Sequence, residues 1–244
     1  MSILQVEDSI GLQSKFHGMD HIDLCYDNSH FTSYQKTVNY NYNSRGFRDC
    51  EWPEAIQNKV WCIGDSFTVG IGQPYEETWP MLLEKKLNEP CIKIAQDGCS
   101  NDLISQRVEQ LKNSYKPRCI IIVWSYFWRR LRYGKNVHFD KDARELPKHD
   151  LQNFVDNFIR ANINPSCKIL NYLIPDCMIE SSSSWLKLRS RKNKKNLLKL
   201  LEYKYPKTDF TNLTEIEQLD YARDGHHFDI STCQKVVDDI LKKY

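Results

Sequence analysis

Hydrophobic residues follow a regular pattern only from residue 59 onward. Short, nearly continuous apolar runs predict buried strands, at 59–63, 91–95, 119–124 and 168–174. Between and after them, longer segments have the residue pattern of helices, at 77–88, 101–115, 151–163 and 231–243. Because strands and helices alternate, the pattern indicates an α/β protein with a parallel sheet and helices on both faces.

Polar residues at the ends of these segments refine the predicted boundaries. We expect Thr78 to cap the first helix and Pro90 to prevent its continuation. Ser231 is expected to cap the closing helix. Residues 185–203 are expected to form a basic amphipathic helix.

The first 54 residues differ from the rest, because they are polar and aromatic and show no long periodicity. The turn-forming run 41–46 indicates short strands and loops. We therefore expect an irregular N-terminal extension over 1–54 and one main domain over 55–244. In parallel sheets of this kind, sites lie at the carboxyl ends of the strands.

The overall composition is that of an ordinary globular protein. Of the 244 residues, 41% are hydrophobic, 27% charged and 12% aromatic, which argues against a disordered or fibrous chain. No apolar run approaches the ~20 residues of a membrane span, and residues 1–15 lack the pattern of a signal peptide. We expect no membrane span and a cytoplasmic location.

Nine cysteines are scattered along the chain, and no C-x-x-C pair occurs. Their odd number and spacing argue against a disulfide framework, so we expect reduced thiols. His21, Cys25 and His30 come nearest to a metal cluster, but they lack the paired spacing of zinc ligands. We expect neither a metal nor a cofactor.

The formal net charge of +2 hides an uneven distribution. Residues 185–199 contain seven Lys or Arg and no acid, which leaves 27 basic and 32 acidic residues elsewhere. Such a run is typical of a solvated helix face, with contact to an anionic partner as the alternative. The chain as a whole is too close to neutral to indicate nucleic-acid binding.

The first predicted strand runs into Gly64-Asp65-Ser66, which puts a serine hydroxyl at the carboxyl edge of the sheet. Other uses of this loop have weaker support. Gly70-x-Gly72 is followed by Gln73 rather than by the Gly-Lys-Ser/Thr of a phosphate loop, and it alone is a weak dinucleotide or methyl-donor motif. Thr68 also replaces the second glycine of an α/β-hydrolase elbow. Ser66 is therefore a candidate nucleophile whose base comes from elsewhere.

A candidate base lies near the end of the chain, where Asp224 and His227 precede the closing helix. Three residues apart in a loop, the carboxylate can accept a hydrogen bond from the imidazole Nδ1. The other ring nitrogen is then free to take a proton from Ser66. A simple polar turn is the alternative for this segment, and the sequence does not exclude the neighbouring His226 as the base.

Taken together, these two elements resemble the first and last motif blocks of the SGNH (GDSL) hydrolase superfamily, a group of esterases and lipases. Gly98, just past the second predicted strand, matches the second-block glycine, and the resemblance covers roughly residues 41–244. It implies a three-layer α/β/α sandwich with a five-stranded, flavodoxin-like parallel sheet. It also implies Ser66 as nucleophile, His227 as general base and Asp224 as its orienting residue. The backbone N–H groups of Ser66 and Gly98 would be oxyanion donors.

One block departs from the family pattern. After the third strand most members carry an Asn whose side chain is a further oxyanion donor, but here Tyr126 or Phe127 falls at that position. Losing one such donor costs about 10²–10³ in rate. We expect the Ser125 hydroxyl or the guanidinium of Arg129 or Arg130 to replace it. Both arginines belong to a cluster that is either a solvated loop or a substrate-binding rim attracting anions.

The resemblance favours a serine hydrolase of acyl esters, and we expect a carbohydrate O-deacetylase or a small-acyl esterase. Its substrate would be an acylated small molecule or glycan. O-acyl transfer on the same fold is one alternative, and a catalytically weak binding module, favoured by the absent Asn, is the other. Fold resemblance chooses neither the acyl group nor the alcohol, and the sequence does not indicate an oligomeric state.

Overall fold

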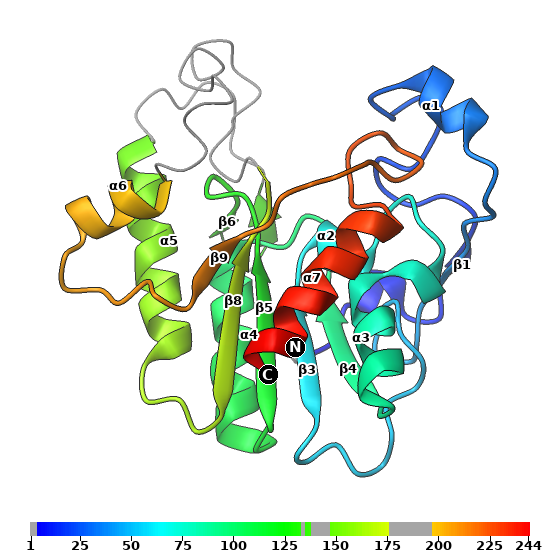
Figure 1. Cartoon of the computed structure of the whole chain (residues 1–244). Coiled ribbons are helices and arrows are strands. Elements are labelled where there is room, and N and C mark those ends of the chain that lie inside the picture. Colours follow the sequence, from blue (N-terminus) through cyan, green and yellow to red (C-terminus); the bar gives the residue numbers. More distant parts are fainter. Residues whose placement is uncertain (1–3, 133–134, 138–146, 176–196) are drawn as a thin grey trace.

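A computed structural model of the chain describes residues 4–132, 135–137, 147–175 and 197–244 (Figure 1). Its centre is a five-stranded sheet in which every pairing is parallel, in the order β4-β3-β5-β8-β9. These strands are β4 (Cys91–Ala95), β3 (Val60–Gly64), β5 (Cys119–Trp124), β8 (Lys168–Leu173) and β9 (Leu213–Glu215). Numbered along the chain, the order is the flavodoxin-like one. In sheets of this order, ligands bind at the carboxyl ends of the strands where the strand order reverses, which here is between β3 and β5.

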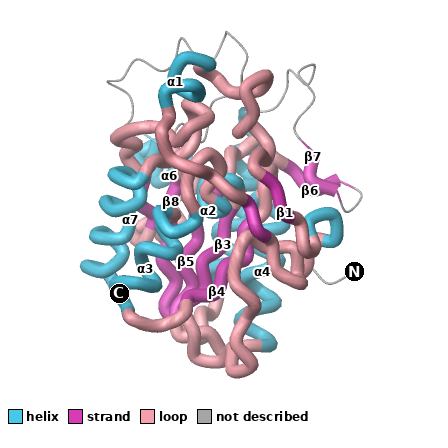
Figure 2. Tube along the Cα trace, turned by 90° about the vertical axis from the view of Figure 1, so that its right-hand side faces the viewer, coloured by secondary structure: helices cyan, strands magenta, loops and turns pink. Residues whose placement is uncertain are grey.

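Two pairs of helices cover the sheet and make the predicted three-layer α/β/α sandwich. On one face α3 (Trp79–Leu87) packs against α7 (Ile230–Lys243), and on the other α4 (Asn101–Ser114) packs against α5 (Pro147–Asn162). Figure 2 shows the sheet between these two layers. Every residue of β3 and β5 is buried, as expected for central strands that meet apolar helix stripes on both sides.

The helix starts agree with the sequence prediction only in part. Thr78 occupies the N-cap position of α3, as predicted, but its hydroxyl donates to the Tyr75 carbonyl instead of accepting from the helix. The prediction of Ser231 as the cap of α7 is wrong, because Asp229 occupies that position and accepts from the backbone N–H groups of Ser231 and Thr232. Aspartate and serine are comparable N-caps, so composition alone does not choose between them.

The irregular N-terminal segment packs onto the sandwich. It contains η1 (Glu7–Ser9), β1 (Gln13–Ser14), α1 (Asn28–Ser33) and β2 (Tyr40–Asn41), and β1 pairs with β2 in an antiparallel ribbon. Leu4 and Phe47 are buried in the same hydrophobic core as the central strands. This segment therefore shares its core with the rest of the chain. The division into residues 1–54 and 55–244 remains a prediction.

Several short elements complete the described chain: α2 (Ser66–Val69), η2 (Tyr75–Glu77), β6 (Arg130–Arg132), β7 (Lys135–Val137) and α6 (Leu197–Lys204). Most of the basic helix predicted over 185–203 lies outside the described residues. Within the described part, no helix combines the length and the apolar character needed to cross a membrane.

Candidate active site

Ser66 opens the short helix α2 directly after β3. Asp65 caps this helix, since its carboxylate accepts from the Phe67 N–H at 3.1 Å. Gly64 allows the tight turn, because a Cβ there would lie 2.8 Å from the Val123 carbonyl oxygen and 2.2 Å from the Thr68 hydroxyl oxygen. The Ser66 hydroxyl is buried and makes no hydrogen bond to the part of the chain that the structure describes.

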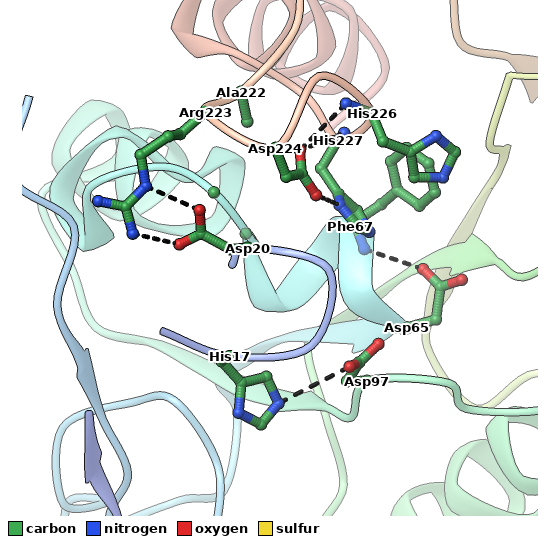
Figure 3. A network of polar contacts seen from close by, with 12 residues as sticks. His17, Asp20, Asp65, Phe67, Asp97, Ala222, Arg223, Asp224, His226 and His227 are labelled. Atoms are coloured by element: carbon green, nitrogen blue, oxygen red, sulfur yellow. Dashed lines mark hydrogen bonds and ion pairs between the residues drawn. The ribbon is translucent and has the colours of Figure 1, made fainter. Parts of the chain in front are cut away.

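Asp224 and His227 form a buried pair in the loop before α7. His227 Nδ1 lies 2.5 Å from Asp224 Oδ2, and Asp224 Oδ1 accepts from the backbone N–H groups of His226 and His227, each at 3.1 Å. These bonds fix the orientation of the imidazole and direct its Nε2 away from Asp224. The carboxylate and imidazole thus adopt the paired arrangement that their spacing suggested (Figure 3).

Asp224 and His227 shift each other's pKa in opposite directions. Burial opposes the charged imidazolium, but the charge and hydrogen bond of Asp224 outweigh burial, so the pKa of His227 lies above 6.5. Burial likewise opposes the Asp224 carboxylate, yet His227 and the backbone N–H groups lower the pKa of Asp224 below its usual value. At neutral pH Asp224 is therefore ionised and able to stabilise a protonated His227.

The serine and the histidine come to the same end of the sheet. The Phe67 ring, directly after Ser66, lies with its centroid 4.6 Å from that of the His227 imidazole. The loop after α2 also touches the Asp224 loop, since Arg223 N–H donates to the Gly72 carbonyl at 2.9 Å. Ser66 and His227 are therefore neighbours, but their side chains share no hydrogen bond in this structure.

Gly98 lies three residues beyond β4, in a loop next to the end of β3. It is buried and has φ +68°, a left-handed conformation that favours glycine over residues with a Cβ. β4 pairs with β3 so that Ala95 is opposite Gly64, which brings the Gly98 loop to the edge where Ser66 lies. The oxyanion roles of the Ser66 and Gly98 N–H groups remain predictions.

Ser125 and Arg129 both bind Asp65 in a buried cluster. Asp65 Oδ2 accepts from the Ser125 hydroxyl at 2.7 Å and from Arg129 Nη1 at 2.8 Å, and Arg129 Nη1 also lies 3.1 Å from Ser125 Oγ. Burial raises the pKa of Asp65, an effect that Arg129 and Ser125 oppose. The cluster ties the loop after β5 to the residue next to Ser66, a pairing that the sequence did not predict.

Arg130 makes a different ion pair. Its Nη2 lies 2.5 Å from Oδ1 of Asp150 on α5, and both side chains are largely buried. The structure thus pairs both predicted arginines with carboxylates, and neither forms an open basic rim. Their substrate-binding roles remain predictions.

The position of the expected third-block Asn is filled by aromatic residues. The Tyr126 hydroxyl lies 2.9 Å from His226 Nε2, and the Phe127 ring stacks on Phe154 with centroids 4.1 Å apart. Burial and the nearby positive charge of His227 lower the pKa of His226 to about 3. Because its proton affinity is so low, His226 is a poorer general base than His227.

Asn101 holds this loop in place, a role that its sequence context does not indicate. Its side chain accepts from the Ser125 N–H at 2.9 Å and donates to the Ser125 and Tyr126 carbonyls at 3.1 and 3.2 Å. An Asn at the first position of a helix indicates only a polar helix start, so the sequence held no stronger signal. These bonds commit the Asn101 amide to the loop and leave it unable to serve as the missing oxyanion donor.

The chain matches no family model, and no curated protein matches it in sequence. Among solved structures it is similar to a carbohydrate esterase whose active site displays divergent catalytic and non-catalytic binding functions (13% identity, 85% of this chain and 78% of that chain, TM-score 0.50). It is also similar to a family two carbohydrate esterase from Clostridium thermocellum in complex with cellohexaose, with 14% sequence identity and a TM-score of 0.49. The match covers 84% of this chain and 66% of that chain, so this chain spans about two thirds of the esterase. A third similar structure is a G-D-S-L lipolytic protein from Veillonella parvula DSM 2008, with 16% sequence identity and a TM-score of 0.45. That match covers 75% of this chain and 96% of the other.

Proposed function

We propose that this chain is a serine esterase that removes a small acyl group from a carbohydrate, with acetyl as the leading candidate. The proposal proceeds from the α/β fold that the chain shares with a carbohydrate esterase, which confirms the predicted architecture. A fold does not choose a reaction, so the site must carry the argument. The buried Asp224–His227 contact, beside the helix that Ser66 opens, is the observation that carries it.

In the proposed reaction, His227 Nε2 takes the proton of the Ser66 hydroxyl as Oγ attacks the acyl carbon. Asp224 holds the imidazole by its Nδ1–H and stabilises the imidazolium that forms. The Ser66 and Gly98 N–H groups donate to the oxyanion. His227 then returns the proton to the departing sugar oxygen, which leaves the acyl group on Ser66. A water molecule next gives a proton to His227 as its oxygen attacks the acyl carbon. The bond between Ser66 Oγ and the acyl group breaks, Ser66 takes the proton from His227, and the free carboxylic acid departs.

Among the three residues considered as substitutes for the missing Asn, the contacts favour Arg129. The Ser125 hydroxyl donates to Asp65, and Arg130 pairs with Asp150. Arg129 Nε is buried and has no partner among the described residues. An unused donor in a buried site is available to a developing negative charge. We therefore propose Arg129 as the third oxyanion donor.

A row of aromatic rings beside His227 supports a sugar as the alcohol. The Tyr26 ring lies 4.8 Å from His226, and the Tyr126 ring stacks on Trp128 at 5.3 Å. Tyr26 is 68% exposed and could pack against the C–H face of a sugar ring.

An ester-cleavage assay tests this proposal. Purified protein should release acetate from an acetylated oligosaccharide and p-nitrophenol from p-nitrophenyl acetate. Ser66→Ala should reduce both rates to background. Ser105→Ala is the matched control, because Ser105 is equally buried but bonds to Asn157 on α5, and it should retain activity. Full activity in Ser66→Ala would remove Ser66 as the nucleophile.

A non-catalytic carbohydrate-binding protein is the second candidate function. The missing Asn and the absent hydrogen bond between Ser66 and His227 favour it. Titration calorimetry with the acetylated oligosaccharide separates the two, because a binding protein gives a saturable isotherm with no product. Acyl transfer is distinguished by product analysis with and without an added sugar acceptor.

A further inference from the structure

A closed ring of polar contacts joins the N-terminal segment to both loops of the candidate site. The Asp20 carboxylate accepts from Arg223 Nε at 2.7 Å and Nη2 at 2.6 Å, and from the Tyr40 hydroxyl at 2.7 Å. The Tyr40 oxygen accepts from the Gly72 N–H at 2.8 Å, and the Gly72 carbonyl accepts from the Arg223 N–H at 2.9 Å. Gly72 belongs to the loop after the Ser66 helix, and Arg223 immediately precedes Asp224.

Asp20 is buried to a degree that an aspartate side chain rarely reaches unless it is paired. It is fully buried, and Arg223 is 12% exposed. Burial of a carboxylate is costly unless it is paired and fully hydrogen bonded, a condition that the two-pronged Arg223 contact and the Tyr40 hydroxyl meet. Such pairs contribute little net stability compared with apolar packing, whereas the two parallel N–H···O bonds of an Arg–carboxylate pair are geometrically specific. The pair therefore suits a role in orientation.

Two further bonds from the same segment hold the Asp224 loop. The Tyr26 N–H donates to the Asp224 carbonyl at 3.1 Å, and His30 Nε2 lies 2.9 Å from the Ala222 carbonyl oxygen. Figure 3 shows Asp20 and Arg223 close to the Asp224–His227 pair. The loop that carries the candidate base is thus held from residues about 200 positions earlier in the chain.

This attachment bears on the reaction because the Ser66 and His227 side chains are not hydrogen bonded to each other. They share no hydrogen bond in this structure, so proton transfer requires the loop of His227 to be held at the right place relative to α2. A misplacement of about 1 Å can cost about 10²-fold in rate. The contacts through Gly72 and Arg223 are a direct connection between these two loops.

Building on the proposed function, we propose that Asp20 is a positioning residue for the reaction. Through Arg223 and Tyr40, its carboxylate holds the Asp224–His227 loop against the loop after the Ser66 helix and so sets the approach of His227 to Ser66. Asp20 touches neither substrate nor reacting atoms, and its effect passes through Arg223.

Loss of Asp20 should also change the titration of His227. The titratable groups that face this imidazole are the carboxylates of Asp224, Asp65 and Asp97 and the neutral imidazole of His226, and among these carboxylates Asp224 is the one that hydrogen bonds to it. If the loop loosens, the Asp224 bond weakens while burial continues to oppose the imidazolium, so the pKa of His227 falls.

The experiment compares wild type, Asp20→Asn and Asp49→Asn. Asp49 is the matched control, because it forms another buried ion pair between the N-terminal segment and the sheet, with Lys93 at 2.8 Å. Apart from Lys93, the described groups that donate to its carboxylate are the Cys50 N–H and the Tyr75 hydroxyl, and neither belongs to the Asp224 loop. Two readouts are used: kcat and KM for p-nitrophenyl acetate from about pH 5 to 9, and an NMR titration of the His227 imidazole. The NMR readout does not require activity.

The proposal predicts that Asp20→Asn lowers kcat at least about tenfold with a nearly unchanged KM. It also predicts that the acid limb of kcat/KM and the NMR midpoint of His227 both move down by about one pH unit. Asp49→Asn should lower the melting temperature without moving either midpoint. Tyr40→Phe, which removes one hydroxyl, should give a smaller change in the same direction and replaces Asp20→Asn if that variant does not fold.

Unchanged midpoints in Asp20→Asn, or in Tyr40→Phe as its replacement, would overturn the proposal, as would equal loss of kcat in Asp20→Asn and Asp49→Asn. A wild-type protein without esterase activity would instead contradict the proposed function. The NMR midpoints would still decide whether Asp20 holds the His227 loop.

Discussion

The imidazole of His227 is the group on which the proposed chemistry depends. It must be neutral to accept the Ser66 proton, and Asp224 raises its pKa above 6.5. kcat/KM should therefore rise with pH through a midpoint above 6.5, because the base becomes available only as the imidazolium loses its proton. Asp224→Asn should lower kcat about 10³–10⁴-fold and move this midpoint downward. A pH–rate profile of both proteins checks this, and a midpoint that stays in place would point to another base.

The low pKa of His226 makes the stability of the fold, not the reaction rate, depend on pH. Its pKa is about 3 in the folded protein and near 6.5 when unfolded. Between pH 6.5 and 3, this imidazole takes up a proton in the unfolded chain but stays neutral in the folded protein. The free energy of unfolding is therefore at its full value above pH 6.5 and decreases as the pH falls toward 3. In His226→Gln the free energy of unfolding, measured by urea denaturation, should decrease less between pH 6.5 and 3 than it does in the wild type. Equal slopes in variant and wild type would show that another group causes the acid sensitivity.

At the scale of elements, the start of α7 matters because this helix follows the His227 loop. Asp229 caps it through two backbone N–H groups, and the Ser231 hydroxyl donates to Asp229 instead of capping. Asp229→Ala should lower the free energy of unfolding by about 0.5–2 kcal/mol. Ser231→Ala is the control and should cost less than about 0.5 kcal/mol. Urea denaturation measures both, and the reverse ranking would restore Ser231 as the cap.

The four longer strands of the sheet were predictable, because a continuous apolar run can be recognised from neighbouring residues alone. The runs that became β3, β4, β5 and β8 are apolar and flanked by turns or helix patterns. β9 was not seen in the pattern, because Leu213–Glu215 has one buried residue out of three. Its place is set by contacts such as the Ile216 N–H to the Leu173 carbonyl, which no local pattern records. Only the family resemblance indicated a fifth strand.

Across the whole molecule, the N-terminal segment and the sandwich share core and ion pairs. Phe47 is fully buried in the main core, and the buried Arg48 guanidinium donates to the carbonyls of Val69, Gly70 and Gln73. A protein consisting of residues 55–244 should therefore lose cooperative unfolding, because these contacts disappear and apolar surface is exposed. Circular dichroism during heating tests this. A sharp transition at the wild-type temperature would show that residues 55–244 fold alone.

The candidate site was predictable in part for the same reason as the fold. Asp224 and His227 are three residues apart, a spacing that allows their pairing but also fits a simple polar turn, and the structure shows the pairing. The partners that hold the site are distant in sequence: Asp65 binds Arg129, and Asp20 binds Arg223. The sequence placed Ser125 and Arg129 at the correct edge of the sheet but not their shared partner, because pairing across loops depends on the final packing.

The proposed chemistry requires Ser66 to be a nucleophile activated by His227, and covalent labelling tests this most directly. The folded protein is treated with a fluorophosphonate, and the modified residue is mapped by mass spectrometry. We expect one adduct, on Ser66, which is absent in Ser66→Ala and forms at least about 10²-fold more slowly in His227→Ala. No adduct on the folded wild-type protein, or an adduct on a different residue, would contradict this chemistry.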